Sequence, residues 1–192
     1  MRRPAAALAL LLLGACTSLP PQATAERNYA GRFSLAVTRE ATNDDEGHRA
    51  WSGRFSLAVG AQALTLDLVS PLGSTIARIE TDSHEARLLV PDNGSVRVER
   101  GTDAQALSQR VLGWSLPIAG MPDWVEGHPA PARPYRTLPQ EDGKDRFEQD
   151  GWTVTVERPD GNRAGLRLQM NHQADGASPE MALRVVLDAP AS

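Results

Sequence analysis

The stretch Gly31-Arg-Phe-Ser-Leu-Ala-Val37 recurs without change as Gly53-Arg-Phe-Ser-Leu-Ala-Val59. Apolar and polar residues alternate in both copies, so that Phe33 and Leu35 point to the same face of an extended chain. This period of two is typical of a β-strand with one buried and one solvated face. So short a repeat is not a solenoid unit. We therefore predict two neighbouring strands, joined by the exposed polar stretch 39–49.

The same alternation continues to the end of the chain. Its further apolar sets are Leu64, Leu66 and Leu68; Thr75, Ala77 and Ile79; Ala86, Leu88 and Val90, with Val96 and Val98; Trp152, Val154 and Val156; Leu166, Leu168 and Met170; and Met181, Leu183, Val185 and Leu187. Asn93-Gly94 is a hairpin signal, and Pro159-Asp-Gly161 is a turn signal. Many short strands separated by turns predict a mainly β domain, either a barrel or a sandwich.

Two short helical segments interrupt this series of strands. The first spans 102–112, with Thr102 as the N-cap of a capping box and Gly113 at the C′ position. The second is Pro122-Asp-Trp-Val-Glu-Gly127, which has proline near its start and glycine at its end. The connecting stretch 113–121 is apolar, so we expect helices and linker to lie across one mouth or face of the sheet.

The N-terminus has the features of an export signal. Arg2 and Arg3 precede the apolar run Ala5–Leu13, which is too short to cross a bilayer. The run ends in Leu13-Gly-Ala-Cys16, which matches the lipobox of bacterial lipoproteins. Cys16 is the only cysteine of the chain. The alternative is an ordinary secretory signal with an incidental cysteine.

These features predict three parts: a lipoprotein-type signal peptide over 1–15, a lipid-anchored tether over 16–27, and one domain over 28–190. We expect Cys16 to carry a covalent diacylglyceryl group and, after cleavage, an N-acyl chain. Each buried CH₂ group contributes about 0.8 kcal/mol, so several acyl chains make the anchor effectively permanent. The residue after the cysteine is Thr17 rather than Asp, which resembles an outer-membrane address.

Several classes of function find no support in the sequence. The net charge is −4 with both signs interspersed, which argues against a nucleic-acid partner. We find no nucleophile elbow, Walker loop or dinucleotide-binding glycine motif. The histidines are isolated and have no metal-ligand spacing, and the acidic run Asp44-Asp-Glu46 is typical of a solvated loop. We therefore expect neither an enzyme nor a metal site, and no cofactor beyond the lipid on Cys16.

A group of motifs in a fixed order resembles the LolB family of outer-membrane lipoprotein receptors. Besides the lipobox and the paired Gly-Arg-Phe-Ser strands, they are Ser70-Pro-Leu-Gly-Ser74, Leu112-Gly-Trp-Ser-Leu-Pro117, Trp124 followed by Gly127, and Phe147-Glu-Gln-Asp-Gly-Trp152. The resemblance covers nearly the whole mature chain. This sequence departs from the family at Leu57, where many relatives have an aromatic residue, and after Leu187, where no closing aromatic strand follows.

The resemblance implies a curved antiparallel sheet that forms an incomplete, half-open β-barrel, with short helices lidding an apolar cavity. It implies a monomer at the periplasmic face of the outer membrane. Such a protein accepts lipoproteins from the periplasmic carrier LolA, binds their acyl chains and inserts them among outer-membrane phospholipids, without ATP or metal. The family's membrane-insertion loop falls on Pro71-Leu72-Gly73, so that Leu72 takes the place of its exposed leucine.

The residues expected to line the acyl-chain cavity are Phe33, Leu35, Phe55, Leu57, Leu66, Leu68, Trp114, Leu116, Ile118, Met121 and Trp124. Pattern alone favours an ordinary packed core at these positions, because every β domain has such faces. Likewise Leu72, at the tip of a good turn sequence, could fold back onto the sheet. The alternative function is therefore a structural or assembly lipoprotein that has a solid interior and acts through its outer surface.

Overall fold

The computed structural model describes residues 26–39, 47–159, 165–175 and 178–189. In these residues the strands form one sheet in the order β6-β5-β4-β3-β2-β1-β11-β10-β9-β8-β7, with antiparallel neighbours throughout. The strands are β1 Arg27–Thr38, β2 His48–Val59, β3 Leu64–Val69, β4 Thr75–Thr81, β5 Ala86–Asp92, β6 Ser95–Gly101, β7 Tyr135–Glu141, β8 Lys144–Gln149, β9 Trp152–Glu157, β10 Arg167–His172 and β11 Glu180–Leu187.

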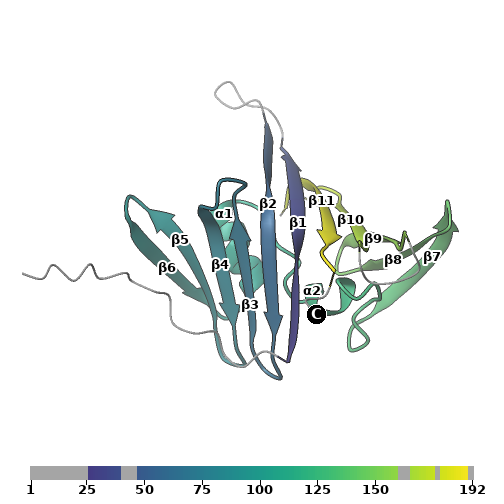
Figure 1. Ribbon diagram of the computed structural model, residues 1–192, viewed down its shortest axis with the longest axis horizontal. Coiled ribbons are helices and arrows are strands. Elements are labelled where there is room, and N and C mark those ends of the chain that lie inside the picture. Colours follow the sequence, from purple (N-terminus) through teal and green to yellow (C-terminus); the bar gives the residue numbers. More distant parts are fainter. Residues whose placement is uncertain (1–25, 40–46, 160–164, 176–177, 190–192) are drawn as a thin grey trace, which may run out of the picture.

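The sheet is strongly curved but does not close. Among the described strands β6 and β7 form its two edges, at opposite ends of the strand order (Figure 1). The two helices, α1 Ala104–Leu112 and α2 Met121–Trp124, cover the inner face of the curve. Of the two architectures that the alternation allowed, the structure is therefore the open barrel, and the predicted fold class is confirmed.

The repeated heptapeptide explains how β1 and β2 pair. The strands are antiparallel neighbours in a register that places Gly31 opposite Phe55 and Phe33 opposite Gly53. Each phenylalanine ring thus lies over the glycine of the other strand. A Cβ atom at Gly31 would come within 2.8 Å of the Phe55 ring and 2.2 Å of the carbonyl oxygen of Val186. Glycine at these positions therefore lets the two rings and the backbones of β1, β2, β3 and β11 approach closely.

The predicted hairpin at Asn93-Gly94 is confirmed. Both residues have positive φ, 46° and 85°, as a two-residue type I′ turn requires. In the other two predicted connections, residues 40–46 of the stretch 39–49 and residues 160–161 of the turn 159–161 lie outside the described part of the chain. Residues 1–25, which include Cys16, also lie outside it.

Some sequence predictions of local structure are wrong in detail. Val96 and Val98 are exposed, because the β5–β6 register pairs them with Pro91 and Leu89, which lie on the face opposite the buried residues of β5. Thr75 is exposed although Ala77 and Ile79 are buried, because the β3–β4 register shifts at Leu68/Val69. Helix α1 begins later than predicted: its N-cap is Asp103, not Thr102, and Asp103 accepts a hydrogen bond from the Ala106 amide. Gly113 ends α1 in the left-handed conformation, as predicted.

Candidate functional site

An apolar hollow lies between the inner face of the sheet and the helices. It is lined by Phe33, Leu35, Phe55, Leu66, Leu68, Trp114, Leu116, Met121 and Leu183. The lining surface is apolar throughout, because the single strong hydrogen-bond donor among these side chains, the indole N–H of Trp114, does not face the hollow. A site of this kind favours a hydrocarbon chain over any polar molecule.

The hollow is small in this conformation. Its volume is about 20 Å³, close to the room that one water-sized probe needs. The surrounding residues form one continuous buried cluster that extends from β1 through β11 and includes the linker between the helices. An acyl chain therefore cannot enter unless part of this cluster moves.

The structure brings most of the predicted cavity residues together. Phe33, Leu35, Phe55, Leu66, Leu68, Trp114, Leu116 and Met121 border the hollow. Leu57, Ile118 and Trp124 are buried in the same cluster but do not line it. Leu183 on β11 lines the hollow and was not among the predicted set. Its signal was the alternating run of β11, which pairs with β1 and so closes the wall beside Phe33 and Leu35.

The cover over the hollow consists of residues 104–124, which form α1, the linker 113–120 and α2. At the α1 end, Ser108 is fully buried and its hydroxyl accepts a hydrogen bond of 3.0 Å from the Leu116 amide. The same hydroxyl donates to the Gln105 carbonyl at 2.8 Å. Trp114 packs against Trp51 of β2, with ring centroids 5.6 Å apart. One buried hydroxyl thus fixes the linker to the helix that precedes it.

At the α2 end the cover is fixed by a buried amide. The Gln149 side-chain oxygen accepts hydrogen bonds of 2.8 Å from the Trp124 indole and from the Ala130 amide. Its nitrogen donates to the carbonyls of Ala130 and Arg133 at 2.9 and 3.1 Å. Gln149 was not among the residues predicted from the sequence, although it lies inside a motif that resembles the LolB family.

A salt bridge ties the segment after α2 to the first strand. Arg27 of β1 donates to Glu126 at 3.0 Å, and the hydroxyl of Tyr29 also donates to Glu126. The hydrogen bond to Glu126 raises the pKa of Arg27 above its ordinary value. The α2 end of the cover is therefore attached both to the inside of β8 and to the start of β1.

The turn between β3 and β4 has a solvent-exposed leucine at its tip. Leu72 is 94% exposed, the most exposed of the large hydrophobic side chains in the described residues. Gly73 has φ 86°, its amide donates to the Ser70 carbonyl at 3.0 Å, and the Ser70 hydroxyl accepts from the Ser74 amide at 3.1 Å. These bonds hold the turn so that Leu72 points away from the sheet. The structure does not show the folded-back alternative.

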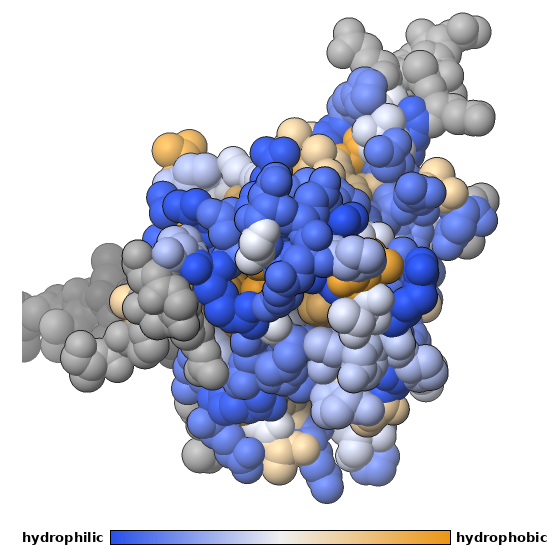
Figure 2. All heavy atoms as spheres, turned by 90° about the vertical axis from the view of Figure 1, so that its right-hand side faces the viewer, coloured by the Kyte–Doolittle hydropathy of each residue, from blue (hydrophilic) through white to orange (hydrophobic). Residues whose placement is uncertain are grey.

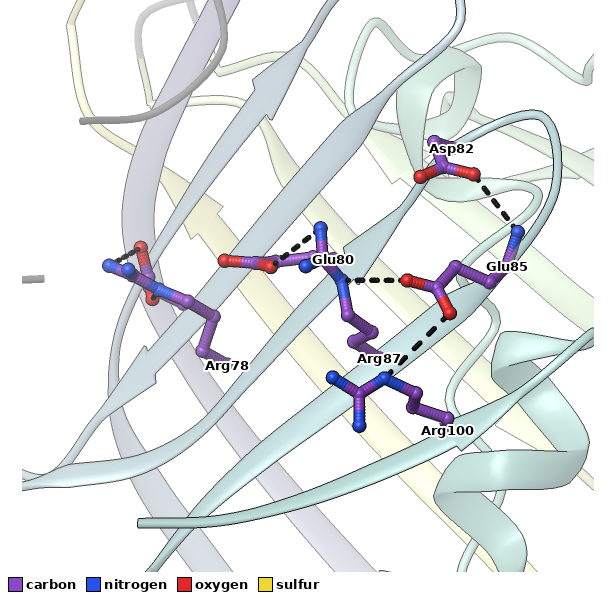
Figure 3. Close-up of polar contacts among 7 residues, drawn as sticks. Arg78, Glu80, Asp82, Glu85, Arg87 and Arg100 are labelled. Atoms are coloured by element: carbon purple, nitrogen blue, oxygen red, sulfur yellow. Dashed lines mark hydrogen bonds and ion pairs between the residues drawn. The ribbon is translucent and has the colours of Figure 1, made fainter. Parts of the chain in front are cut away.

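The outer face of β3 to β6 carries an orderly set of ion pairs (Figure 3). They join Arg78 to Asp67 at 2.5 Å, Arg87 to Glu80 at 3.3 Å and to Glu85 at 3.4 Å, and Arg100 to Glu85 at 3.8 Å. The hydrogen bonds that Arg78 donates to the Asp67 carboxylate raise the pKa of Arg78. Backbone amides of Glu85 and His84 lower the pKa of Asp82 in the adjoining turn. Charges on this face therefore neutralise one another within the sheet.

Among the described residues, no helix is both long and apolar enough to cross a membrane. In residues 26–39, 47–159, 165–175 and 178–189, no group of three or more His, Cys, Asp or Glu side chains could hold a metal ion.

Comparison with known proteins gives a consistent result. A family model described as "Outer membrane lipoprotein LolB" matches residues 27–189. The outer-membrane lipoprotein LolB of Cupriavidus pinatubonensis is 32% identical over 192 residues, which cover 93% of this chain and 89% of that protein. The protein of the same name from Bordetella petrii is 36% identical over 169 residues, which cover 84% of this chain and 80% of the relative. The protein of the same name from Ralstonia nicotianae is 31% identical over 202 residues, which cover 94% of this chain and 92% of the relative.

Proposed function

The chain belongs to the LolB family of outer-membrane lipoproteins, and from that premise we propose that it relays lipoproteins into the outer membrane. It accepts them from a LolA-like periplasmic carrier and releases them into the inner leaflet. Their acyl chains pass through the apolar hollow on the way. Its own anchor is the lipid on Cys16, and outer-membrane phospholipid is the medium that receives the cargo.

The wholly apolar lining of the hollow carries this proposal. A lipoprotein has several acyl chains, and exposing each CH₂ group to water costs about 0.8 kcal/mol. A relay must therefore shield the chains, and the inner face of this sheet is the place that offers only hydrocarbon contacts. Transfer then follows an order of increasing affinity, from carrier to hollow to bilayer, and requires no chemical energy.

Acyl binding requires the cover to move, because the closed hollow has only about 20 Å³. Displacing the linker would remove Trp114 and Leu116 from the hollow and leave the strand residues as its walls. An arriving acyl chain then replaces the contacts that these side chains lose. The closed conformation thus serves as the empty state of the receptor, in which its own side chains protect the apolar walls from water.

Leu72 provides the contact with the membrane. It lies at the tip of a hydrogen-bonded turn, and its side chain is almost fully exposed. Burying a leucine side chain in an apolar medium is worth about 1.5–3 kcal/mol. This turn therefore orients the receptor towards the bilayer during release.

One observation favours the alternative function of a structural lipoprotein, namely the nearly filled interior. Titration of the unlipidated mature chain (Cys16→Ser) with a fluorescent fatty acid separates the two functions. The relay predicts saturable binding that unlabelled fatty acid displaces. A structural lipoprotein with a permanently filled interior would bind no fatty acid. Depletion in the native host provides a second test, because the relay predicts that lipoprotein-loaded carrier accumulates in the periplasm.

The variant Leu72→Glu tests the membrane contact. Folding and fatty-acid binding should match those of the parent chain, because the side chain contacts nothing. Delivery of cargo to phospholipid vesicles should fall by about tenfold or more, since a charged side chain is costly to insert into a bilayer. The matched control is Ser83→Glu, which adds a charge to the exposed β4–β5 turn. Normal delivery by Leu72→Glu would refute this role.

A further inference from the structure

A second pocket, with both polar and apolar side chains in its lining, lies at one end of β8, β9 and β10. It has a volume of about 640 Å³ and lies between the start of β7, the β8–β9 turn and the end of β10. Its walls include Tyr135, Arg136, Trp152 and His172. The side of the molecule that carries β7 is covered mainly by hydrophilic side chains, with apolar ones visible in only a few places (Figure 2). We call this site the rim pocket.

Two buried polar side chains of the rim pocket have unused hydrogen-bonding atoms. Trp152 is 1% exposed and His172 is 7% exposed, and their rings meet edge to face at 5.3 Å. Neither the indole Nε1 of Trp152 nor Nδ1 of His172 has a hydrogen-bond partner in the described residues. Buried groups of this kind are rare in native proteins. Both atoms are buried, so a ligand reaches them when the adjoining side chains move, and a carbonyl that accepts a hydrogen bond from the indole then removes the unfavourable state.

The charge of the rim pocket restricts the ligand. Its lining includes the carboxylates of Glu148, Asp150 and Asp175 but only one guanidinium, that of Arg136. Arg136 already binds Glu148 at 2.6 Å. Asp150 in turn pairs with Arg133, and Asp175 lies 3.6 Å from Nε2 of His172, so the pocket offers no uncompensated cation to a phosphate or a free carboxylate. The pocket therefore suits uncharged carbonyl groups, such as those of esters and peptides.

Two residue pairs on the inner face of β10 and β11 connect the rim pocket to the hollow. His172 of the rim pocket pairs with Met181, and the next pair on the same face is Met170 with Leu183, which lines the hollow. The two cavities are thus separated by buried methionines. Methionine side chains adapt their shape readily. A ligand with an apolar tail and a polar end could fill both cavities at once.

We infer that the rim pocket binds the polar junction of the cargo, the glyceryl esters and first peptide groups that follow the acyl chains of a lipoprotein. This inference rests on the proposed function, because the acyl chains must occupy the hollow. Ester or peptide carbonyls accept a hydrogen bond from the Trp152 N–H, and a peptide N–H or carbonyl forms a hydrogen bond with Nδ1 of His172. The site lets the receptor distinguish a lipoprotein terminus from a free fatty acid or a phospholipid.

Two probes with equal acyl chains test the inference: a fluorescent fatty acid and a diacylglyceryl-cysteine peptide. Each is titrated into the mature Cys16→Ser chain and into two variants, Trp152→Phe and His172→Phe, which keep aromatic rings but remove the nitrogens. Loss of one hydrogen bond predicts about three- to tenfold weaker binding of the lipopeptide. Binding of the fatty acid should be unchanged. The control is Gln169→Ala, an exposed residue of β10.

Each outcome is decisive. Selective loss of lipopeptide affinity supports the site, whereas unchanged lipopeptide affinity, or equal losses for both probes, overturns it. If the parent chain binds neither probe, the proposed function fails as well. Should a variant not fold, the indole N–H signal of Trp152 in the parent chain provides the answer by NMR. It should shift with the lipopeptide and not with the fatty acid, and an identical response to both would contradict the inference.

Discussion

The two ends of the cover are held in different ways. At the α2 end, Trp124 is completely buried, and its indole is one of several groups bound by the Gln149 amide. At the α1 end, Leu107 and Ser108 are the only buried residues of the helix. There the Ser108 hydroxyl joins helix to linker, and two exposed side chains, Arg110 and Arg39, donate to the carbonyls of Arg100 and Gly113. The α2 end thus belongs to the core of the domain, whereas the α1 end rests on it.

This difference indicates which part of the cover opens. Segments with few buried contacts open at a small fraction of the global unfolding free energy. Moving α1 and the linker exposes Trp114 and Leu116 but leaves the Gln149 bonds intact. Moving α2 would break those bonds and expose buried polar groups. We therefore expect the hollow to open at the α1 end while α2 stays in place as a hinge.

The largest effect is expected from breaking the α2 end. Gln149→Leu keeps a side chain of similar size but leaves the buried N–H groups of Trp124 and Ala130 without an acceptor. Each such loss costs about 1–3 kcal/mol, so unfolding in urea should show a destabilisation of about 2–5 kcal/mol. The exposed control Gln169→Leu should stay within about 0.5 kcal/mol of the parent chain. A loss no larger than that of the control would mean that α2 is not fixed by this amide.

A smaller effect, with a kinetic signature, is expected from the α1 end. Ser108→Ala removes the acceptor of the Leu116 amide and should cost about 1–2 kcal/mol. Because the linker is then released, fatty-acid uptake in stopped-flow measurements and hydrogen exchange at Leu116 should both become faster. Ser83→Ala, in an exposed turn, is the control. Unchanged uptake by Ser108→Ala, or equally accelerated uptake by Gln149→Leu, would reverse the assignment of hinge and moving part.

The sequence predicts the walls of the hollow better than its cover. Strands such as β1, β3 and β9 place an apolar residue at every second position, and one buried face suffices to specify them. β7 and β8 lack this alternating pattern. β7 is exposed along most of its length and contains Pro139, and β8 has Phe147 as its single apolar residue. They pair as an edge hairpin that the sheet stabilises through backbone bonds, which leave no hydrophobic pattern.

Other features depend on contacts between residues far apart in the chain. Gln149 is buried because it binds backbone groups on the α2–β7 connection. A glutamine in a strand does not by itself indicate that such partners exist. The volume of the hollow is equally hidden, because the same alternation serves a filled core and an open cavity. Leu72 was identifiable only through the resemblance to a family. The turn sequence by itself is compatible with either direction of the side chain.

The smallest effect concerns the start of α1, where sequence and structure differ by one residue. The capping-box spacing favours Thr102, but the Asp103 carboxylate accepts the hydrogen bond from the Ala106 amide. Asp103→Ala should therefore cost about 1 kcal/mol in urea unfolding, whereas Thr102→Ala should cost less than about 0.5 kcal/mol. Because α1 is the moving part, Asp103→Ala should also accelerate fatty-acid uptake slightly, and Thr102→Ala should not. A larger loss of stability for Thr102→Ala than for Asp103→Ala would identify Thr102 as the cap and contradict the proposed role of α1 as the moving part.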